Sequence, residues 1–379
     1  MTSITMPKKV PAVFMRGGAG RGIFFHERDI PAPGPERDHI FLSVLGSPDP
    51  FGRQLNGMGG GNSSLSKVVI VRTAADTEVD VEYLHGQVSL SSAIVDYSAN
   101  CGNLSGAVGP FAVSEGLVAL KEGITVVRMR NLNTGDIVHA HVPVEHGDYP
   151  NSGRYAIPGV GGANAKVALE YLMPGGGCIL ATNSARETIS GVDVTLGLSP
   201  LATVWTHGPQ INFPTSLSPQ EIDSDLRIMS SLDHLRRLGA VRMRLADSLT
   251  NANLASPKIG IVSPPTDYVA LDGKSISADD FDISARVLSM EMVHKSIPLA
   301  CAMNLAAATC IEGSVPFEMA KRSAPGEFRI GTPSGVLNIR VVVKPNATGF
   351  PYLARVGVDT SARRLMEGYV FYDPAETSA

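Results

Sequence analysis

The sequence has no apolar run long enough to cross a membrane and no excess of basic residues. Its longest apolar stretch, residues 297–311, is interrupted by a proline and by polar residues, which is unlike a membrane span. The 379 residues carry a formal net charge of −4. This balance argues against a nucleic-acid or anionic-membrane partner that is held by bulk charge. We therefore expect neither kind of partner.

Cysteine is also scarce. The four cysteines are Cys101, Cys178, Cys301 and Cys310, and their spacing matches neither a zinc site nor a CxxC redox pair. The N-terminus shows no secretory signal pattern, so we expect reduced thiols in a cytoplasmic protein. The length predicts two or three domains with sizeable cores.

One segment, residues 100–111, reads NCGNLSGAVGPF and follows a strand-like run over residues 93–97. Leu104, Val108 and Phe111 recur at helical spacing, which predicts a helix that begins just after Cys101. The first turn of a helix offers free N–H groups and a partial positive charge, which suit a carboxylate and favour ionisation of a thiol. Cys101 is therefore a candidate acid or base, although most free cysteines are small buried hydrophobic residues.

Two glycine-rich loops precede this segment. Residues 16–22 read RGGAGRG and join two predicted strands; they could wrap an anion through backbone N–H groups or form a tight turn, and they are not a Walker loop. Residues 56–67 read NGMGGGNSSLSK and run into a strand over residues 68–73. Lys67 lies at this junction. A lysine there is usually solvated, but in a closed site its pKa would fall and it could act as a base.

Periodicity predicts the other elements. His139 and His141 share a strand face, which we interpret as an ordinary strand rather than a metal site because the sequence places no third ligand. The predicted elements are a helix over residues 37–45, an exposed strand over 78–90, a hairpin of 124–130 and 137–144, a glycine turn at 174–178, and helices over 219–249, 283–293 and 296–311.

Each half of the chain combines many short strands with one apolar helix rich in small residues, over residues 103–117 and 298–311. We therefore predict an α+β fold of two similar lobes, residues 8–185 and 186–375, each a curled sheet or barrel around a central helix. If the lobes face each other, both helix N-termini and the Gly/Ser loops would meet in one cleft. We expect the active site there.

The chain resembles the PrpF family over nearly its whole length. The shared motifs occur in the same order: MRGG at 15–18, GSPDP at 46–50, GMGG at 57–60, SK at 66–67, NCGN at 100–103, PKI at 257–259, LSM at 288–290, PSG at 333–335 and SAR at 361–363. The family comprises 2-methylaconitate isomerases and relatives such as 4-oxalomesaconate tautomerases, methylitaconate isomerases and aconitate isomerases. The resemblance implies a diaminopimelate-epimerase-like fold, with no metal and no organic cofactor.

The resemblance also implies a reaction, the shift of an allylic proton in an unsaturated di- or tricarboxylate, by cis–trans or double-bond isomerisation. The family's acid/base residues match Lys67 and Cys101. The residues expected to bind the substrate are Arg16, Gly17, Ser63, Ser64, Ser66, Asn100, Gly102, Asn103, Leu104, Thr332, Ser334 and Gly335. The oligomeric state is left open, with a homodimer as one option.

Three alternatives remain open from the sequence: a keto–enol tautomerase of the 4-oxalomesaconate type, an amino-acid epimerase, and a non-catalytic carboxylate-binding partner of a dehydratase. Several stretches differ from the related patterns, and two of these differences concern single residues. Thr332 stands where the family has a histidine before Pro-Ser-Gly. The second catalytic cysteine of the epimerases has no clear match, because Cys301 falls about one turn into its predicted helix.

Overall fold

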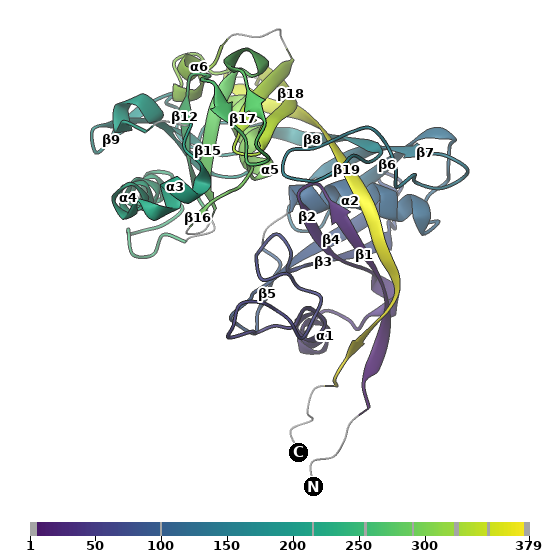
Figure 1. The fold of residues 1–379 in the computed structure, drawn as a ribbon. Coiled ribbons are helices and arrows are strands. Elements are labelled where there is room, and N and C mark those ends of the chain that lie inside the picture. The colour runs from purple at the N-terminus through teal and green to yellow at the C-terminus, as the bar shows by residue number, and fades with distance from the viewer. Residues whose placement is uncertain are drawn as a thin grey trace. The chain divides into compact units, whose positions relative to one another are not determined.

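The computed structural model describes residues 6–98, 101–213, 216–253, 256–289, 292–321, 326–346 and 349–374. The chain forms two compact units, Met1–Tyr171 with Asp359–Ala379, and Leu172–Val358 (Figure 1). Both units mix helices and strands, so the predicted α+β class is confirmed. Within the described ranges, no helix is long and apolar enough to span a membrane.

The elements follow one another in a strand-rich order. The first unit holds β1 Lys8–Gly17, β2 Gly20–His26, η1 Glu27–Asp29, α1 Pro35–Leu45, β3 Lys67–Thr73, β4 Val81–Val88, β5 Val95–Asp96, α2 Gly102–Ser114, β6 Gly123–Asn131, β7 Ile137–Val144 and the start of β8 Lys166–Cys178. The second unit holds β9 Glu187–Ile189, β10 Val192–Gly197, β11 Thr203–His207, η2 Gly208–Ile211, α3 Pro219–Ser224, α4 Leu226–Arg242, β12 Lys258–Ser263, β13 Tyr268–Val269, β14 Ser275–Ile276, η3 Ala278–Asp280, β15 Ile283–Ser289, β16 Met292–Val293, α5 Leu299–Ala308, α6 Val315–Met319, β17 Glu327–Thr332 and β18 Gly335–Pro345. Strand β19, Pro351–Tyr372, begins in the second unit and ends in the first.

Helix α2 is the central helix of the first unit. Strand β2 pairs antiparallel with β1 and parallel with β3, β3 pairs antiparallel with β4, and β4 pairs parallel with β6, which forms the predicted hairpin with β7. Helix α2 contacts β1, β2, β3, β6 and β7 (Figure 1). The sheet therefore curls around this helix, as the sequence predicts.

The continuous apolar runs of β2 and β3 follow from burial of both faces. Successive side chains in a strand point to opposite faces. Phe24 packs on Phe111 of α2 with ring centroids 5.5 Å apart, and Phe25 packs on Phe41 of α1 at 5.3 Å. Because a helix covers each face, these strands need no polar side.

Small residues inside α2 allow the helix to approach the sheet closely. A Cβ atom at Gly109 would lie 2.8 Å from the side chains of both Ala140 and Val142, and one at Gly106 would lie 2.7 Å from Thr360. The glycines of the helix interior therefore serve helix–sheet packing.

The second unit repeats this order of strands. Strand β11 pairs antiparallel with β10 and parallel with β12, β12 pairs antiparallel with β15, and β15 pairs parallel with β17, which forms a hairpin with β18. Helix α5 contacts β10, β11 and β18, and its Asn304 accepts a 2.7 Å hydrogen bond from the Trp205 indole. Each unit thus has one central helix.

Several predicted elements were wrong. Residues 283–293 form strands β15 and β16 instead of a helix; both faces of β15 are buried, including Ser284 and Arg286, so its sequence lacks a clear period of two. The glycine run at 174–178 ends strand β8 instead of forming a turn. Strand β4 is mostly buried, because it lies between β3 and β6.

Gly57 offers a test of the loop that leads to Lys67. A Cβ atom there would lie 2.2 Å from the Gly46 nitrogen and 2.3 Å from the Leu45 carbonyl carbon, and backbone atoms cannot move aside cheaply. We expect Gly57→Ala to lower the free energy of unfolding by about 2 kcal/mol or more, and the melting temperature by about 4–8 °C. Gly161→Ala, where nothing lies within 4 Å, is the control; equal melting temperatures for the two variants would contradict this packing.

Candidate active site

Cys101 lies directly before the first residue of α2, as predicted. It is the N-cap residue, and its carbonyl accepts the Ser105 amide at 3.1 Å. The side chain is buried, with 9% of the residue exposed. The N–H groups of the first helical turn, in Gly102, Asn103 and Leu104, follow it immediately.

The surroundings of Cys101 favour its thiolate. Burial raises the pKa of the thiol, but the charge of Lys67, the hydrogen bond and charge of His85, and the Leu104 amide together lower it to about 5. A buried thiolate is stable only where positive charge or hydrogen-bond donors compensate its lost hydration. These surroundings therefore favour the ionised thiolate of Cys101 over the neutral thiol.

Lys67 is the first residue of β3 and is half-buried, so the site around it is only partly closed. Its Nζ donates a 2.7 Å hydrogen bond to the Gln87 side-chain carbonyl, directly across the sheet on β4. The Gln87 amide in turn donates to the Ser66 carbonyl at 2.9 Å. The hydrogen bond to Gln87 holds the Lys67 ammonium group on one face of the sheet. From this face its charge acts on the Cys101 thiol.

His85 is the site residue that sequence reasoning missed. It lies on β4 two residues before Gln87, and its Cα partner on β3 is Val69, two residues after Lys67. Side chains two apart share a face of a strand, so Lys67, His85 and Gln87 all face α2. Only the register between the two strands gives this grouping.

The serine loop before Lys67 is held by Gln54. Its side-chain amide donates to the hydroxyls of Ser66 and Ser47, at 2.7 and 2.8 Å, and its carbonyl accepts the Gly61 amide at 3.1 Å. Ser66 is fully buried and donates to the Val88 carbonyl. Its hydroxyl therefore acts within the protein as a loop anchor, and its contact with a substrate stays a prediction.

Two other serines of this loop lie closer to solvent. Ser63 is exposed, and the Ser64 hydroxyl donates to Asn62 at 2.6 Å. The Ser64 carbonyl accepts the Arg21 amide at 3.1 Å, which ties this loop to the β1–β2 hairpin. Their backbone and hydroxyl groups remain candidates for holding a carboxylate.

The first glycine loop is a tight turn that packs on the start of α2. Gly17 and Gly20 pair across the β1–β2 hairpin, and a Cβ atom at Gly17 would lie 2.7 Å from the Asn103 carbonyl oxygen. The Asn103 side chain accepts the Ala19 amide at 3.3 Å. Arg16 bonds the carbonyl and hydroxyl of Ser361 and the Asn164 side chain. Its guanidinium is therefore engaged with the protein itself.

Three of the remaining predicted residues belong to the second unit. Thr332, Ser334 and Gly335 form the β17–β18 turn of the second unit, where the Thr332 hydroxyl donates to the Gly335 carbonyl at 2.8 Å and Ser334 donates to the Lys295 carbonyl at 2.5 Å. Asn100 is outside the described residues. Among those described, no group of three His, Cys, Asp or Glu residues could hold a metal ion.

The second unit carries a comparable lysine and cysteine with the opposite electrostatics. Lys258 begins β12 as Lys67 begins β3, and Cys301 lies in α5. Cys301 is the third helical residue and is fully buried. Burial raises its pKa to about 11, despite the Thr203 hydrogen bond and the Lys258 charge. Cys301 is therefore a buried thiol whose surroundings favour the neutral form.

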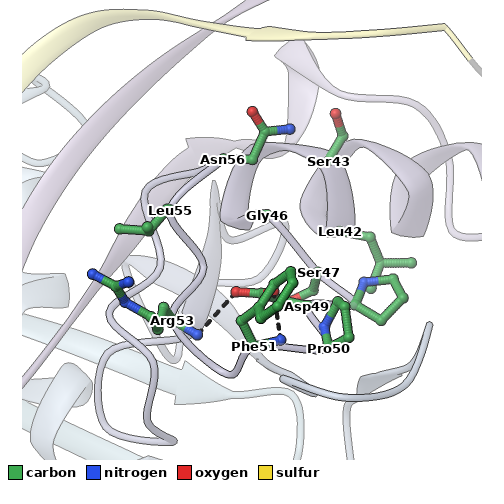
Figure 2. Close-up of a pocket in the computed structure, with 11 residues that line it drawn as sticks. Leu42, Ser43, Gly46, Ser47, Asp49, Pro50, Phe51, Arg53, Leu55 and Asn56 are labelled. Carbon is green, nitrogen blue, oxygen red and sulfur yellow. Dashed lines mark hydrogen bonds between the residues drawn. The ribbon is translucent and has the colours of Figure 1, made fainter.

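A surface cavity of about 620 Å³ adjoins the GSPDP loop (Figure 2). Asp49 accepts the amides of Phe51 and Arg53, each at 2.9 Å, and these bonds lower the pKa of its carboxyl group, the Phe51 amide most. Neither Lys67 nor Cys101 is among the described residues that line the cavity. The described lining of this cavity thus includes neither of the two predicted acid/base residues.

The sequence matches known isomerases over nearly its whole length. A model of the PrpF protein family matches residues 7–373. The 2-methyl-aconitate isomerase of Shewanella oneidensis is 34% identical, over 96% of each chain. The 3-methylitaconate isomerase of Eubacterium barkeri is 32% identical, over 97% of this chain and 98% of the relative.

A solved structure supports the same assignment. The crystal structure of methylitaconate-delta-isomerase has a TM-score of 0.83 and 32% identity, and covers 97% of both chains. This match confirms the fold that the family resemblance implied. The chain is accordingly an isomerase, and it belongs to the PrpF family.

Proposed function

We propose that this isomerase moves an allylic proton in an unsaturated di- or tricarboxylate of the aconitate type, with Cys101 and Lys67 as its proton-carrying groups. The observation that carries the proposal is the Lys67 charge beside the Cys101 sulfur at the N-terminus of α2. The names of the relatives, which act on methylaconitate and methylitaconate, support this substrate class.

The electrostatics suggest which group removes the proton. Cys101 is a thiolate at neutral pH, because its pKa is lowered to about 5 with the Lys67 charge as the largest stabilising cause. The thiolate takes the allylic proton and becomes a thiol, while the substrate becomes a dienolate. The Lys67 ammonium then gives a proton to the other end of the allylic system. The double bond has moved, and one C–H bond has broken while another has formed.

The dienolate needs donors that face its developing charge. The N–H groups of Gly102, Asn103 and Leu104 begin α2 next to Cys101, and a helix N-terminus stabilises a carboxylate there. In this proposal Cys101 is the base, Lys67 is the acid, and the N–H groups of α2 stabilise the negative charge of the dienolate. Before the next turnover a proton must pass from the Cys101 thiol to the Lys67 amine, either directly or through solvent.

Proton NMR of the purified protein with a panel of acids tests the proposal. The panel holds cis- and trans-aconitate, 2-methylaconitate, 3-methylitaconate and 4-oxalomesaconate, with proline as the epimerase control. A new isomer of one unsaturated tricarboxylate or dicarboxylate is the expected result. Turnover of 4-oxalomesaconate alone would favour the tautomerase, and exchange at the α-carbon of proline alone would favour the epimerase.

We also propose that the enzyme works in the cytoplasm and has no nucleic-acid or membrane partner.

The pH dependence of kcat/KM follows from Cys101. Its folded pKa of about 5 lies below the ordinary thiol value, so the active thiolate persists above about pH 5 and is lost as the pH falls through that value. We expect kcat/KM to fall about tenfold for each pH unit below about 5, which gives the rate profile an acid limb at that pH. A rate profile measured in buffers of constant ionic strength checks this; an acid limb near pH 8 would contradict the assignment.

A further inference from the structure

His85 lies on the same face of the sheet as Lys67. It lies on β4 with only 2% of its surface exposed. Two residues further along the strand, Gln87 holds the Lys67 ammonium at 2.7 Å, and the strand register sets His85 beside Val69 of β3. An imidazole here is enclosed between the sheet and α2, where it can act only on its immediate neighbours.

The backbone of His85 is clamped from a different hairpin. The Asn133 side chain, in the turn between β6 and β7, accepts the His85 amide at 2.9 Å and donates to the His85 carbonyl at 2.8 Å. The same side-chain amide also donates to the Tyr97 carbonyl at 2.8 Å. These bonds use main-chain atoms of His85, so they position the strand whatever side chain stands there, and they hold the ring on a rigid element.

The ring interacts with the side chain of Cys101. A side-chain hydrogen bond from His85 and its electrostatic interaction both favour the thiolate of Cys101, after the charge of Lys67. A thiolate that is cut off from water needs such donors, because burial alone disfavours the charged form. Lys67 supplies charge from β3, and His85 supplies a directed donor from β4.

We propose that His85 is a positioning residue, which holds the Cys101 sulfur as a thiolate beside Lys67 and thereby sets the lower pH limit of the reaction. It acts through Cys101, without touching the reacting carbon. The kinetic part of this inference rests on the proposed function. The ionisation of the thiol does not depend on any substrate, so that part can be tested separately.

Other titratable groups around Cys101 do not replace His85. The groups that face this region from the packed elements, among the described residues, are Lys67 of β3, Tyr83 of β4, Tyr171 of β8 and Asp136 of the β6–β7 turn. Burial raises the pKa of both tyrosines well above the ordinary value, so they stay uncharged at working pH. Asp136 carries negative charge and would oppose a thiolate. Lys67 and His85 are therefore the groups that stabilise the Cys101 anion.

The rate of alkylation of Cys101 by iodoacetamide, followed from pH 4 to pH 9 and located by peptide mass spectrometry, tests the inference, because only the thiolate reacts. Wild-type protein should show a midpoint near 5. His85→Phe removes the donor but keeps the backbone clamp, and we expect its midpoint to rise by about two units, which slows alkylation at pH 6 about tenfold. His85→Gln restores an N–H donor and should recover part of the shift.

Two comparisons separate positioning from packing. Tyr83→Phe, two residues away on the same face, removes a hydroxyl that bonds Ser105 and should leave the Cys101 midpoint unchanged. In steady-state kinetics, His85→Phe should move the acid limb of kcat/KM upward and lower kcat at pH 6 with little change in KM. His85→Gln serves as the folded variant if His85→Phe is destabilised, and its midpoint should lie between those of wild type and an ordinary thiol.

The outcomes distinguish this inference from the proposed function. An unchanged Cys101 midpoint in folded His85→Phe or His85→Gln would overturn the positioning role, whatever the substrate. A raised midpoint in a protein that turns over none of the panel acids would support the positioning role and reject the proposed function. Melting temperatures lowered equally in both variants, with the midpoint kept near 5, would show that His85 only fills space.

Discussion

Replacing Cys101 by serine lowers kcat/KM by about 10²–10⁴-fold while the protein stays folded. A serine hydroxyl keeps the size of the side chain but does not ionise near neutral pH, so the base is lost. A serine hydroxyl can still accept the hydrogen bonds that His85 and the Leu104 amide make to the Cys101 side chain, so we expect the substitution to leave the fold intact. Steady-state assay with the acid identified by NMR, together with circular dichroism, measures both parts.

Cys301 provides the matched control for this substitution. It is the thiol near the start of the other central helix, but burial keeps it neutral by raising its pKa to about 11. Cys301→Ala should reduce the free energy of unfolding by about 0.5–1.5 kcal/mol through a small cavity and leave kcat/KM within about twofold. Normal activity in Cys101→Ser, or the same loss in both variants, would refute the role assigned to Cys101.

Two substitutions at Lys67 separate its charge from its proton. Lys67→Met removes both, and we expect a loss of about 10²–10⁴-fold in kcat/KM together with a raised acid limb, since the charge that stabilises the Cys101 thiolate is gone. Lys67→Arg keeps the charge, but a guanidinium does not give up its proton in this pH range. We expect Lys67→Arg to lose isomerisation and to keep the midpoint of Cys101 alkylation by iodoacetamide near pH 5.

Deuterium labelling sharpens the Lys67 comparison. In D₂O, Lys67→Arg should still let Cys101 remove the allylic proton and return a deuteron to the same carbon, so label enters the starting acid without formation of the isomer. Lys67→Met should do neither at an appreciable rate. Isomerisation by Lys67→Arg at the wild-type rate would mean that Lys67 supplies only charge, and another group would have to donate the proton.

Local sequence signals predicted the parts of the fold that depend on neighbours in the chain. Residues 124–144 carry strand patterns on both sides of a turn, and they form the β6–β7 hairpin. The helix after Cys101 has helical spacing and a clear start, and α2 begins at Gly102. In such cases the local preference and the final packing agree.

The failures occur where burial on both faces hides the period of a strand. Strand β15 has buried Ile283, Ala285 and Val287, but the alternating Ser284 and Arg286 are buried as well. With both faces enclosed, the spacing of apolar residues no longer separates a strand from a helix. The end of strand β8 was misassigned because it is a run of glycines, and glycine indicates a turn more often than a strand.

The candidate site was predicted only in part, for a related reason. Lys67 and Cys101 stand in recognisable motifs, whereas His85 and Gln87 stand in an ordinary strand with no local signature. Their importance comes from the register between β3 and β4, which brings Gln87 opposite Lys67 and His85 opposite Val69. Strand register is set by long-range packing, so one sequence read alone does not reveal it.

The most direct test of proton transfer by Cys101 and Lys67 is proton NMR in D₂O of wild-type protein and Cys101→Ser with the unsaturated acid that is turned over. The account predicts that wild-type protein forms the isomer with deuterium at the newly protonated carbon, and that Cys101→Ser gives neither isomer nor label. Isomer that forms without deuterium over many turnovers, or labelled isomer from Cys101→Ser at the wild-type rate, would contradict it.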